Sequence, residues 1–308
     1  MNSNTVRHES AIYDDEIDLK ELFNVLWKHK TLIILVTSFF ALGSIFYSLN
    51  LTNHYKSEAV LNIAGASTTN SLSGLGGMAS MVGINLPVSS ENKATLAIKI
   101  IQSRAFLKYL ITFEHILPSI MAAKSYNHQS KKILFDPEIY NKDDDKWVRK
   151  PKKNQQAKPS YLEAYSTYLQ QVSISQEKVT GFITISVEHI SPIFAKEFLD
   201  LIISETNELL RNQDLRESTD AIEFLVSEIP KSSLISMKDA INQLVLSKLE
   251  MQMMAKISSE YVLKIIEPPF VPEKKSQPKR SLIVILGTLL GGMFASLWVL
   301  IRHYVQAV

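Results

Sequence analysis

The sequence predicts an α+β fold in which two transmembrane helices flank one large globular domain that contains a long helix. Three observations lead to this prediction. Two uncharged apolar runs lie close to the two ends of the chain. Between them, short stretches of alternating apolar residues indicate strands. A helical period of apolar residues also continues from Phe194 towards Pro230, which indicates an unusually long helix.

Composition excludes several classes of function. The chain has 308 residues, of which 46% are hydrophobic and 21% charged, so it can bury a full core and is too apolar to be disordered. Its 33 basic and 31 acidic residues nearly cancel, which leaves no net field to concentrate nucleic acid. The absence of cysteine excludes disulfides, thiolate zinc sites and cysteine nucleophiles. We expect no nucleic-acid partner.

The N-terminal segment, residues 1–30, precedes the first apolar run. Its apolar residues recur at helical spacing, and two acidic residues resemble a capping box. We expect a short helix at the membrane surface that leads into the first span. The residues that form this pattern are Ile17, Leu19, Phe23, Leu26 and Trp27, with Asp18 and Glu21.

Residues 31–51 and 281–301 are the two predicted spans. The first has no charge from Thr31 to Leu49, and the second has none from Ser281 to Ile301. At about 1.5 Å per helical residue, each run can cross a hydrocarbon core of about 30 Å. A buried core helix is the alternative, although such helices seldom run this far without a charge. A short tail, residues 302–308, follows the second span.

The charges beside the first span predict its orientation. Three lysines and His29 lie before it, whereas His54 and Lys56 lie close after it. The positive-inside rule therefore places the N-terminus in the cytoplasm. The second span then returns the C-terminus to the cytoplasm, and residues 52–280 lie on the other side of the inner membrane, in the periplasm.

The charges beside the second span point the other way. Four basic residues precede it and two positively charged or titratable residues follow it. Because a connecting segment of this length translocates largely regardless of its charge, we let the first span decide the topology. The residues concerned are Lys274, Lys275, Lys279 and Arg280 before the span, and Arg302 and His303 after it.

The first half of the large domain contains a predicted strand, a loop and a helix. Tyr55–Ile63 alternates as a strand does, and Ser67–Gly83 is a glycine-rich loop. A phosphate-cradling loop is the alternative there, but the G-x-x-x-x-G-K-[ST] pattern is absent. Asn92–Ile111 has the spacing of a helix packed on a sheet. Asp143–Asp145 belongs to a solvated loop, because a calcium loop needs alternating ligands and a turn glycine.

The second half is dominated by helices. Val172–Val187 consists of two alternating runs, which predict a hairpin or a pair of neighbouring strands. Ser191 and Pro192 then provide an N-cap and a first-turn proline for the long helix, which would extend about 55 Å. Its middle, Asn212–Asp220, is nearly all polar, so we expect it to project from the core or to contact neighbouring copies. Two shorter helices broken at this point are the alternative.

A second helix and a closing strand complete the domain. Apolar residues at helical spacing predict a helix over Ile235–Ile257, and Tyr261–Ile266 is typical of a strand. A connector, residues 267–280, then leads to the second span. Its prolines favour an extended, polyproline-like rod with few backbone donors. The connector motif comprises Pro268, Pro269, Pro272, Pro278, Lys279 and Arg280.

The second span contains closely spaced glycines. Gly287 and Gly291 form a small-xxx-small step, and Gly292 is adjacent. Such a step lets helices pack closely in lipid. It also occurs by chance in membrane helices, so its role in packing is open at this point.

Both ends of the chain resemble the chain-length determinant family, the Wzz-type polysaccharide co-polymerases. Asp15–Ile33 resembles the N-terminal signature of the family, and Glu267–Gly287 resembles its proline-rich segment running into the second span. The order of strand, helix, hairpin, long helix and closing strand is also similar. One departure is Lys275, where the family often has another proline.

The resemblance implies a periplasmic α/β base domain with a long projecting helix, assembled as a homo-oligomer. It implies that the protein regulates the modal length of a lipid-linked surface polysaccharide, lipopolysaccharide O-antigen, together with a separate O-antigen polymerase. No kinase domain follows the second span, which favours the O-antigen type over capsule or exopolysaccharide types. A two-span structural adaptor of a polysaccharide export system is the alternative.

Two other functions are disfavoured by the residues themselves. A two-span sensor needs a cytoplasmic signalling module, for which the terminal segments are too short. A glycan-processing enzyme needs two placed carboxylates, and the isolated acids are more simply solvated. The scattered histidines show no metal-binding spacing. We expect no catalytic, cofactor-binding or metal-binding residues, and no enzyme. The acids considered are Glu188, Glu197, Asp200 and Glu205.

Overall fold

The computed structural model describes residues 19–63, 90–151, 155–231 and 235–307. The predicted glycine-rich loop, Ser67–Gly83, lies outside these residues, as do Ile17 and Asp18 of the predicted N-terminal cap. The chain divides into two compact units. One, the span unit, ends at Leu51 and resumes at Pro278, and the other, the large unit, comprises Thr52–Gln277.

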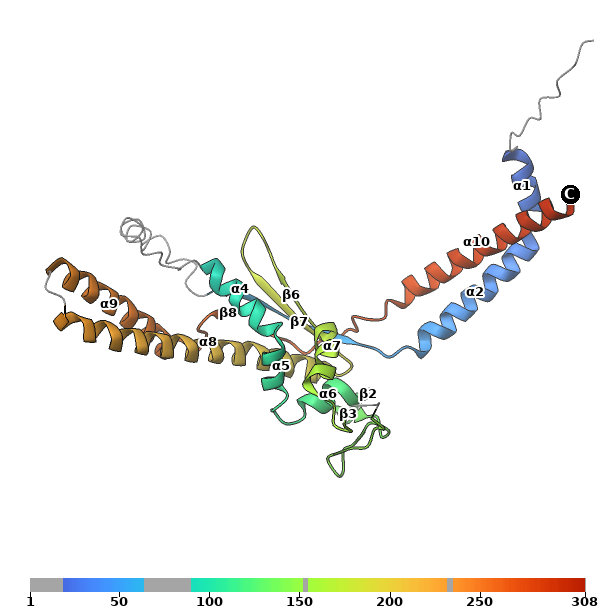
Figure 1. Cartoon of the computed structure of the whole chain (residues 1–308). Helices are drawn as coiled ribbons and strands as arrows, with labels where there is room; N and C mark the ends of the chain where they lie inside the picture. Colours follow the sequence, from blue (N-terminus) through green and yellow to red (C-terminus); the bar gives the residue numbers. More distant parts are fainter. Residues whose placement is uncertain (1–18, 64–89, 152–154, 232–234, 308) are drawn as a thin grey trace, which may run out of the picture. The chain divides into compact units, whose positions relative to one another are not determined.

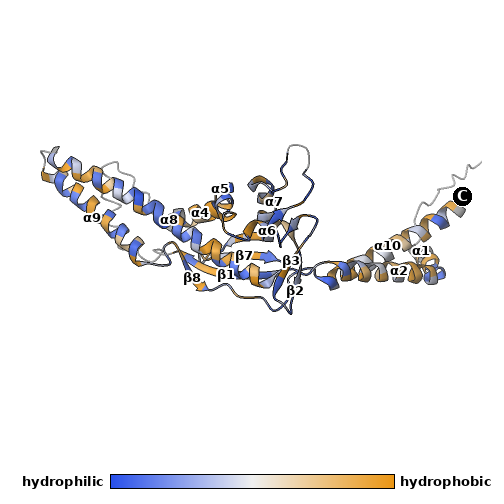
Figure 2. Cartoon of the chain, turned by 90° about the horizontal axis from the view of Figure 1, so that it is seen from below, coloured by the Kyte–Doolittle hydropathy of each residue, from blue (hydrophilic) through white to orange (hydrophobic). Residues whose placement is uncertain are grey.

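The span unit consists of three helices: α1 (Leu19–Lys28), α2 (Lys30–Asn50) and α10 (Arg280–Ala307). Among the described residues, α2 and the Arg280–Val305 part of α10 are long and apolar enough to cross a membrane, and Figure 2 shows both as largely hydrophobic. Large side chains on α2 face outward, and Leu35 and Phe39 are 70% and 73% exposed. A core helix would bury these side chains, whereas a helix surrounded by lipid can expose them.

A four-stranded antiparallel sheet forms the centre of the large unit, in the order β6-β7-β1-β8. Its strands are β1 (Tyr55–Ile63), β6 (Val172–Gln176), β7 (Ile183–His189) and β8 (Leu263–Glu267). The predicted strand and hairpin are confirmed, and the closing strand begins two residues later than predicted. Alternate residues of β1 are buried, so one face of the sheet is covered by helices and the other is partly open.

The long helix α8 (Pro192–Glu228) packs across the covered face of the sheet. Ser191 caps it by accepting a hydrogen bond from the Phe194 amide. Its inner half supplies core residues such as Phe198 and Ile202, which are fully buried. Asn207 fixes the helix to β8 through three hydrogen bonds with the backbone of Val262 and Leu263. The prediction of one continuous helix is confirmed.

The outer half of α8 pairs with α9 (Ile235–Ile257), which folds back along it (Figure 1). A short 3₁₀ turn, Ile229–Lys231, ends α8. The polar stretch Asn212–Asp220 does not simply project: Ser218 is buried, and Thr219 accepts a hydrogen bond from Gln252 of α9. The stretch thus extends beyond the sheet as predicted, and α9, which the prediction did not place there, covers one of its faces.

The predicted helix over Asn92–Ile111 is wrong in one respect. The structure has two helices, α4 (Ser90–Ile101) and α5 (Arg104–Leu110). Ser103 separates them, because its extended backbone and its side chain, which accepts a hydrogen bond from the Phe106 amide, form an N-cap. A capping serine inside a helical pattern favours such a break.

Several short elements of the large unit were not predicted from the sequence. They are two small hairpins and two helices that lie beside the main sheet. Helix α7 starts with a full capping box between Ser160 and Glu163. The elements are α6 (Ile116–Ala122), β2 (Ala123–Asn127), β3 (Lys132–Phe135), β4 (Tyr140–Asn141), β5 (Lys146–Trp147) and α7 (Tyr161–Gln171).

Candidate functional site

The connector after β8 lies against the sheet through two of its prolines. Pro269 and Pro272 are buried, whereas Pro268 is exposed. A polyproline helix has three residues per turn, so positions 269 and 272 share one face. The Phe270 carbonyl between them accepts a hydrogen bond of 2.7 Å from the Ser57 hydroxyl of β1. The spacing of the prolines therefore sets which side of the connector contacts the domain.

The end of the connector is fixed to β1 and β7. His54 and Gln277 form an antiparallel bridge, with the His54 amide donating to the Gln277 carbonyl at 3.0 Å. Glu188 accepts hydrogen bonds from the Ser276 hydroxyl at 2.8 Å and from the side-chain amide Nε2 of Gln277 at 3.2 Å. We call Pro268–Gln277 the strap. Sequence reasoning placed Glu188 among solvated acids and missed this role.

The glycines of the second span lie against α2. A Cβ atom on Gly287 would be 1.8 Å from the Ser44 hydroxyl, and one on Gly291 would be 2.5 Å from the Phe40 Cβ. Gly292 has more room, since its Cβ would be 3.7 Å from the Thr37 hydroxyl. Gly287 and Gly291 thus stand at positions where α2 and α10 approach each other closely, and Phe40 stacks near Phe294. Pro278, Lys279 and Arg280 belong to this unit.

The outer face of α9 carries a stripe of exposed apolar side chains. At 3.6 residues per turn, four of them fall on one side of the helix. They are between 40% and 79% exposed. Such a stripe in water marks a surface for self-association or for a partner. We call it the α9 stripe, and it consists of Leu246, Leu249, Met253 and Ile257.

A polar cluster fastens the middle of α8 to neighbouring elements. Asp214 accepts hydrogen bonds from the Lys93 ammonium at 2.8 Å and the Tyr261 hydroxyl at 2.5 Å. Burial and the bond to Asp214 raise the pKa of Tyr261 well above its usual range. The Arg211 guanidinium donates to the last carbonyls after α9, those of Ser258 and Ser259, where a cation complements the helix dipole.

A buried histidine stands at the foot of α8. His189 is 1% exposed, and its Nε2 lies 2.9 Å from the Ser119 carbonyl. Its Nδ1 accepts a hydrogen bond from the Ser191 amide at 3.0 Å, so the neutral ring must carry its proton on Nε2. Burial lowers the pKa of His189 to about 4. This histidine is a structural support of the α8 N-cap.

Asp200 and Glu205, two of the acidic residues considered in the sequence, are engaged in separate contacts. Asp200 pairs with Lys196 at 2.7 Å, and Glu205 accepts a bond from the Tyr109 hydroxyl at 2.6 Å. In the Asp143–Asp145 turn, the Tyr140 hydroxyl donates to Asp145, which raises the pKa of Tyr140 to about 12. Within residues 19–63, 90–151, 155–231 and 235–307, no group of three or more His, Asp or Glu is placed to hold a metal ion.

Two family models match the chain. Residues 15–112 match the model described as Wzz, chain length determinant protein. Residues 236–304 match the model described as a G-rich domain on putative tyrosine kinase. The first match runs from α1 through α2 and β1 to the end of α5. The second runs from α9 through β8 and the strap into α10. No curated protein matches the chain by sequence.

Several solved structures are similar to the chain, and two of them are described here. A full-length bacterial polysaccharide co-polymerase is 13% identical, with a TM-score of 0.42, and the match covers 94% of this chain and 99% of that one. A fragment of WzzB, a polysaccharide co-polymerase from Salmonella Typhimurium, is 12% identical, with a TM-score of 0.30, and the match covers 73% and 100%. Both likenesses are remote and assign no fold.

Proposed function

We propose that this chain sets the modal length of lipopolysaccharide O-antigen, as a member of the Wzz family of chain length determinants, whose model its residues 15–112 match. A separate membrane polymerase forms the glycosidic bonds, and this chain regulates how many repeats are added to the lipid-linked polymer. The family match is the observation that carries the proposal.

The chain acts without catalysing a reaction of its own in this proposal. Glycosidic chemistry requires two carboxylates on either side of a bound sugar. Glu188 instead fastens the strap, and Asp200 and Glu205 are bonded to Lys196 and Tyr109. These contacts support a regulatory and structural role, with the polymerase and the lipid-linked polysaccharide as its partners.

The proposed location is the bacterial inner membrane, with both termini in the cytoplasm and the large domain in the periplasm. The cytoplasmic segment is residues 1–30, the spans are 31–51 and 281–301, and the tail is 302–308. Since the chain contains no cysteine, single cysteines report topology without background. A membrane-impermeant maleimide applied to spheroplasts should label Val179→Cys, at a turn that is 93% exposed, and should leave His303→Cys unlabelled. Labelling of both or of the second alone would contradict this topology.

We further propose a homo-oligomer held together in part by the α9 stripe. Four apolar side chains on one side of a water-exposed helix are better covered than solvated, since each buried methylene contributes about 0.8 kcal/mol. A second copy of the chain carries the same α9 stripe, so the stripes of two copies can cover each other.

Complementation tests the function directly. The chain is expressed in a strain that has an O-antigen polymerase and lacks its own length regulator, and the lipopolysaccharide is separated on a gel. We expect bands clustered at one preferred length. Gly291→Leu should return an unregulated ladder, whereas Gly43→Leu, where no described atom lies within 4 Å of an added Cβ, should keep the cluster. An unregulated ladder from the wild-type chain paired with its native polymerase would refute the proposal.

A second candidate is a structural adaptor of a polysaccharide export system. It is favoured by the match of residues 236–304 to a G-rich domain described as standing on putative tyrosine kinases. Deleting the gene in its own host distinguishes the two. Loss of exported polymer at unchanged O-antigen length would support the adaptor, and a broadened O-antigen length distribution with normal export would support the regulator.

A further inference from the structure

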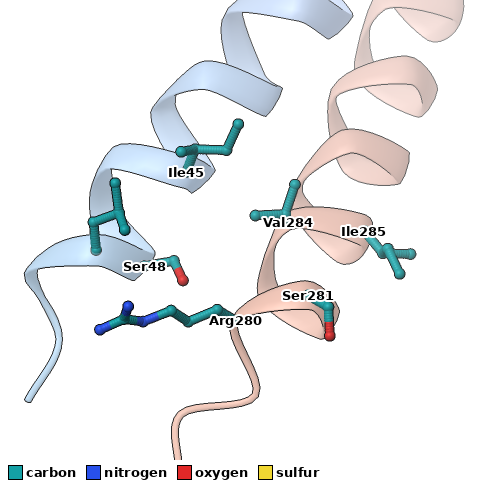
Figure 3. A pocket seen from close by; sticks show the side chains of 7 residues that line it. Ile45, Ser48, Arg280, Ser281, Val284 and Ile285 are labelled. Atoms are coloured by element: carbon teal, nitrogen blue, oxygen red, sulfur yellow. The ribbon is translucent and has the colours of Figure 1, made fainter. Parts of the chain in front are cut away.

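A cavity of about 380 Å³ opens between the end of α2 and the start of α10, within the span unit (Figure 3). Four aliphatic side chains form its walls, namely Ile45, Leu49, Val284 and Ile285. Its polar lining comes from Ser48, Arg280 and Ser281. Since these residues end one span and begin the other, the cavity lies at the depth where a bilayer places its head groups.

Ser48 differs from four other hydroxyl residues in the spans. Thr37 and Ser44 of α2 donate to the carbonyl four residues earlier, at 2.7 and 2.8 Å, and Thr288 and Ser296 of α10 do the same. Ser48 is 2% exposed, and its hydroxyl has no hydrogen-bond partner among the described residues. A buried hydroxyl without a partner is costly, so this group is placed to bond something that enters the cavity.

Arg280 brings a positive charge to the cavity. Arg280 is the first residue of α10, where the helix dipole and the first backbone amides favour an anion. Figure 3 shows its side chain extending from α10 across the gap towards α2, below Ser48. A guanidinium matches the geometry of phosphate oxygens. The cavity thus combines a cation, a hydroxyl donor and aliphatic walls.

We propose that this cavity binds an anionic phospholipid of the surrounding bilayer. Arg280 and the Ser48 hydroxyl hold the phosphate, and Ile45, Leu49, Val284 and Ile285 contact the start of an acyl chain. Such a ligand satisfies the buried hydroxyl and places aliphatic chain where the walls are aliphatic. It also gives a reason for a basic residue at the periplasmic end of the second span, where the positive-inside rule does not expect one.

The test measures lipid retained by the full-length chain. The protein is reconstituted in nanodiscs of phosphatidylcholine and phosphatidylglycerol, released into mild detergent, and examined by native mass spectrometry. We expect retained phosphatidylglycerol to exceed phosphatidylcholine by about tenfold, the change associated with one good charge-assisted hydrogen bond. Arg280→Gln should abolish this preference, and Ser48→Ala should reduce it several-fold. Equal retention of the two lipids, or full retention by both variants, would overturn the proposal.

Two matched controls separate binding from general damage. Ser296→Ala removes a span hydroxyl that bonds the Gly292 carbonyl, and Lys275→Gln removes an exposed charge; both should retain phosphatidylglycerol as the wild type does. Thermal unfolding adds an independent readout. Phosphatidylglycerol should raise the Tm of the wild type more than that of Ser48→Ala. If Ser48→Ala is simply more stable with either lipid, the hydroxyl is an unsatisfied group and not a ligand-binding one.

A final arm distinguishes the lipid from a soluble anion. Inorganic phosphate is titrated into the detergent-solubilised chain, and the Tm is followed. We expect no shift, because phosphate alone cannot use the aliphatic walls. A Tm increase with inorganic phosphate equal to that with phosphatidylglycerol would replace the lipid by a free anion.

Discussion

The chain contains two antiparallel helix pairs that are stabilised in opposite ways. In the span unit, α2 and α10 approach through Gly287 and Gly291, which sit against Ser44 and Phe40. In the large unit, α8 and α9 meet with polar bonds such as Thr219–Gln252 in between. The first pair relies on close backbone approach, which is how helices associate in lipid. The second combines partial apolar burial with hydrogen bonds.

Exposed apolar side chains therefore have a different significance in the two units. Phe39 on α2 and Ile257 on α9 are both large, apolar and exposed, at 73% and 79%. On α2 the surrounding lipid is as apolar as the side chain, so the exposure costs nothing. On α9, in the proposed periplasmic location, the surroundings are aqueous, and the exposure is the reason for proposing that a second copy covers the α9 stripe. Exposure has to be interpreted against the solvent of each unit.

The largest effect should come from filling the glycine contact of the span pair. Gly291→Leu forces atoms into Phe40, whose Cβ would lie 2.5 Å from an added Cβ, and overpacking of this kind costs about 1–3 kcal/mol or more. Because the chain has no cysteine, a Thr37→Cys/Gly292→Cys pair can report the contact by disulfide formation. We expect Gly291→Leu to lower the cross-linking yield several-fold, and Gly43→Leu to leave it unchanged. Equal yields would mean that the glycines do not set the approach.

Acid should lower the stability of the large unit through His189, which is buried beside the N-terminus of α8. Since burial lowers the pKa of His189 to about 4, the unfolded chain takes up a proton below its ordinary pKa of about 6.5 while the folded chain does not. The free energy of unfolding should fall between pH 6.5 and pH 4, by about 3 kcal/mol in all. Circular dichroism melts of the full chain in detergent measure this.

A histidine variant isolates that contribution. His189→Gln cannot titrate, so its Tm should change less than that of the wild type between pH 6.5 and pH 4. If wild type and variant lose stability in parallel, other groups cause the acid sensitivity.

Charge on the α9 stripe should weaken self-association. Met253→Glu places a carboxylate in the proposed contact, where we expect about a tenfold loss of affinity. Light scattering of the detergent-solubilised protein over a concentration series gives the mass of the assembly. Val179→Glu is the matched control, since Val179 is 93% exposed on the β6–β7 turn. An unchanged assembly of Met253→Glu would remove the stripe from the contact.

The smallest effect should follow the loss of one polar bond between α8 and α9. Gln252→Ala removes the exposed 2.9 Å bond to Thr219, which contributes about 0.5–1.5 kcal/mol. Hydrogen exchange of the α9 amides should become slightly faster. Gln243→Ala, at an exposed position of the same helix, should leave the rates as they are. Equal rates in both variants would assign the stability of the pair to apolar contacts alone.

The sequence predicted the elements whose pattern is long and repeated. The spans, α8 and α9 each extend over many turns, so a few exceptions do not hide their period, and the hairpin turn ends at Gly181, which has a φ of +75°. The break at Ser103 was missed because apolar spacing continues through it. Helix α7 was not predicted, although Ser160 and Glu163 have the spacing of a capping box. This local signal could have located the start of the helix.

The site was less accessible to sequence reasoning than the fold. Proline spacing predicted an extended connector, and the structure places Pro269 and Pro272 on the sheet. The role of Glu188 depends on strand register, which sets it beside Ser276 only after β1 and β7 have paired. The covering of the Asn212–Asp220 stretch likewise depends on where α9 returns. Contacts between distant segments are not encoded in any local period.

The strap has a consequence for how the chain can be divided and exchanged. His54 and Gln277, close to the first and last residues of the large unit, are joined by a 3.0 Å hydrogen bond between their backbones. A folded unit whose two ends are neighbours can be inserted into another chain, or removed from its own, with little change to either. Thr52–Gln277 can thus be exchanged as a unit, in evolution or by design, between different pairs of spans whose own sequences do not change.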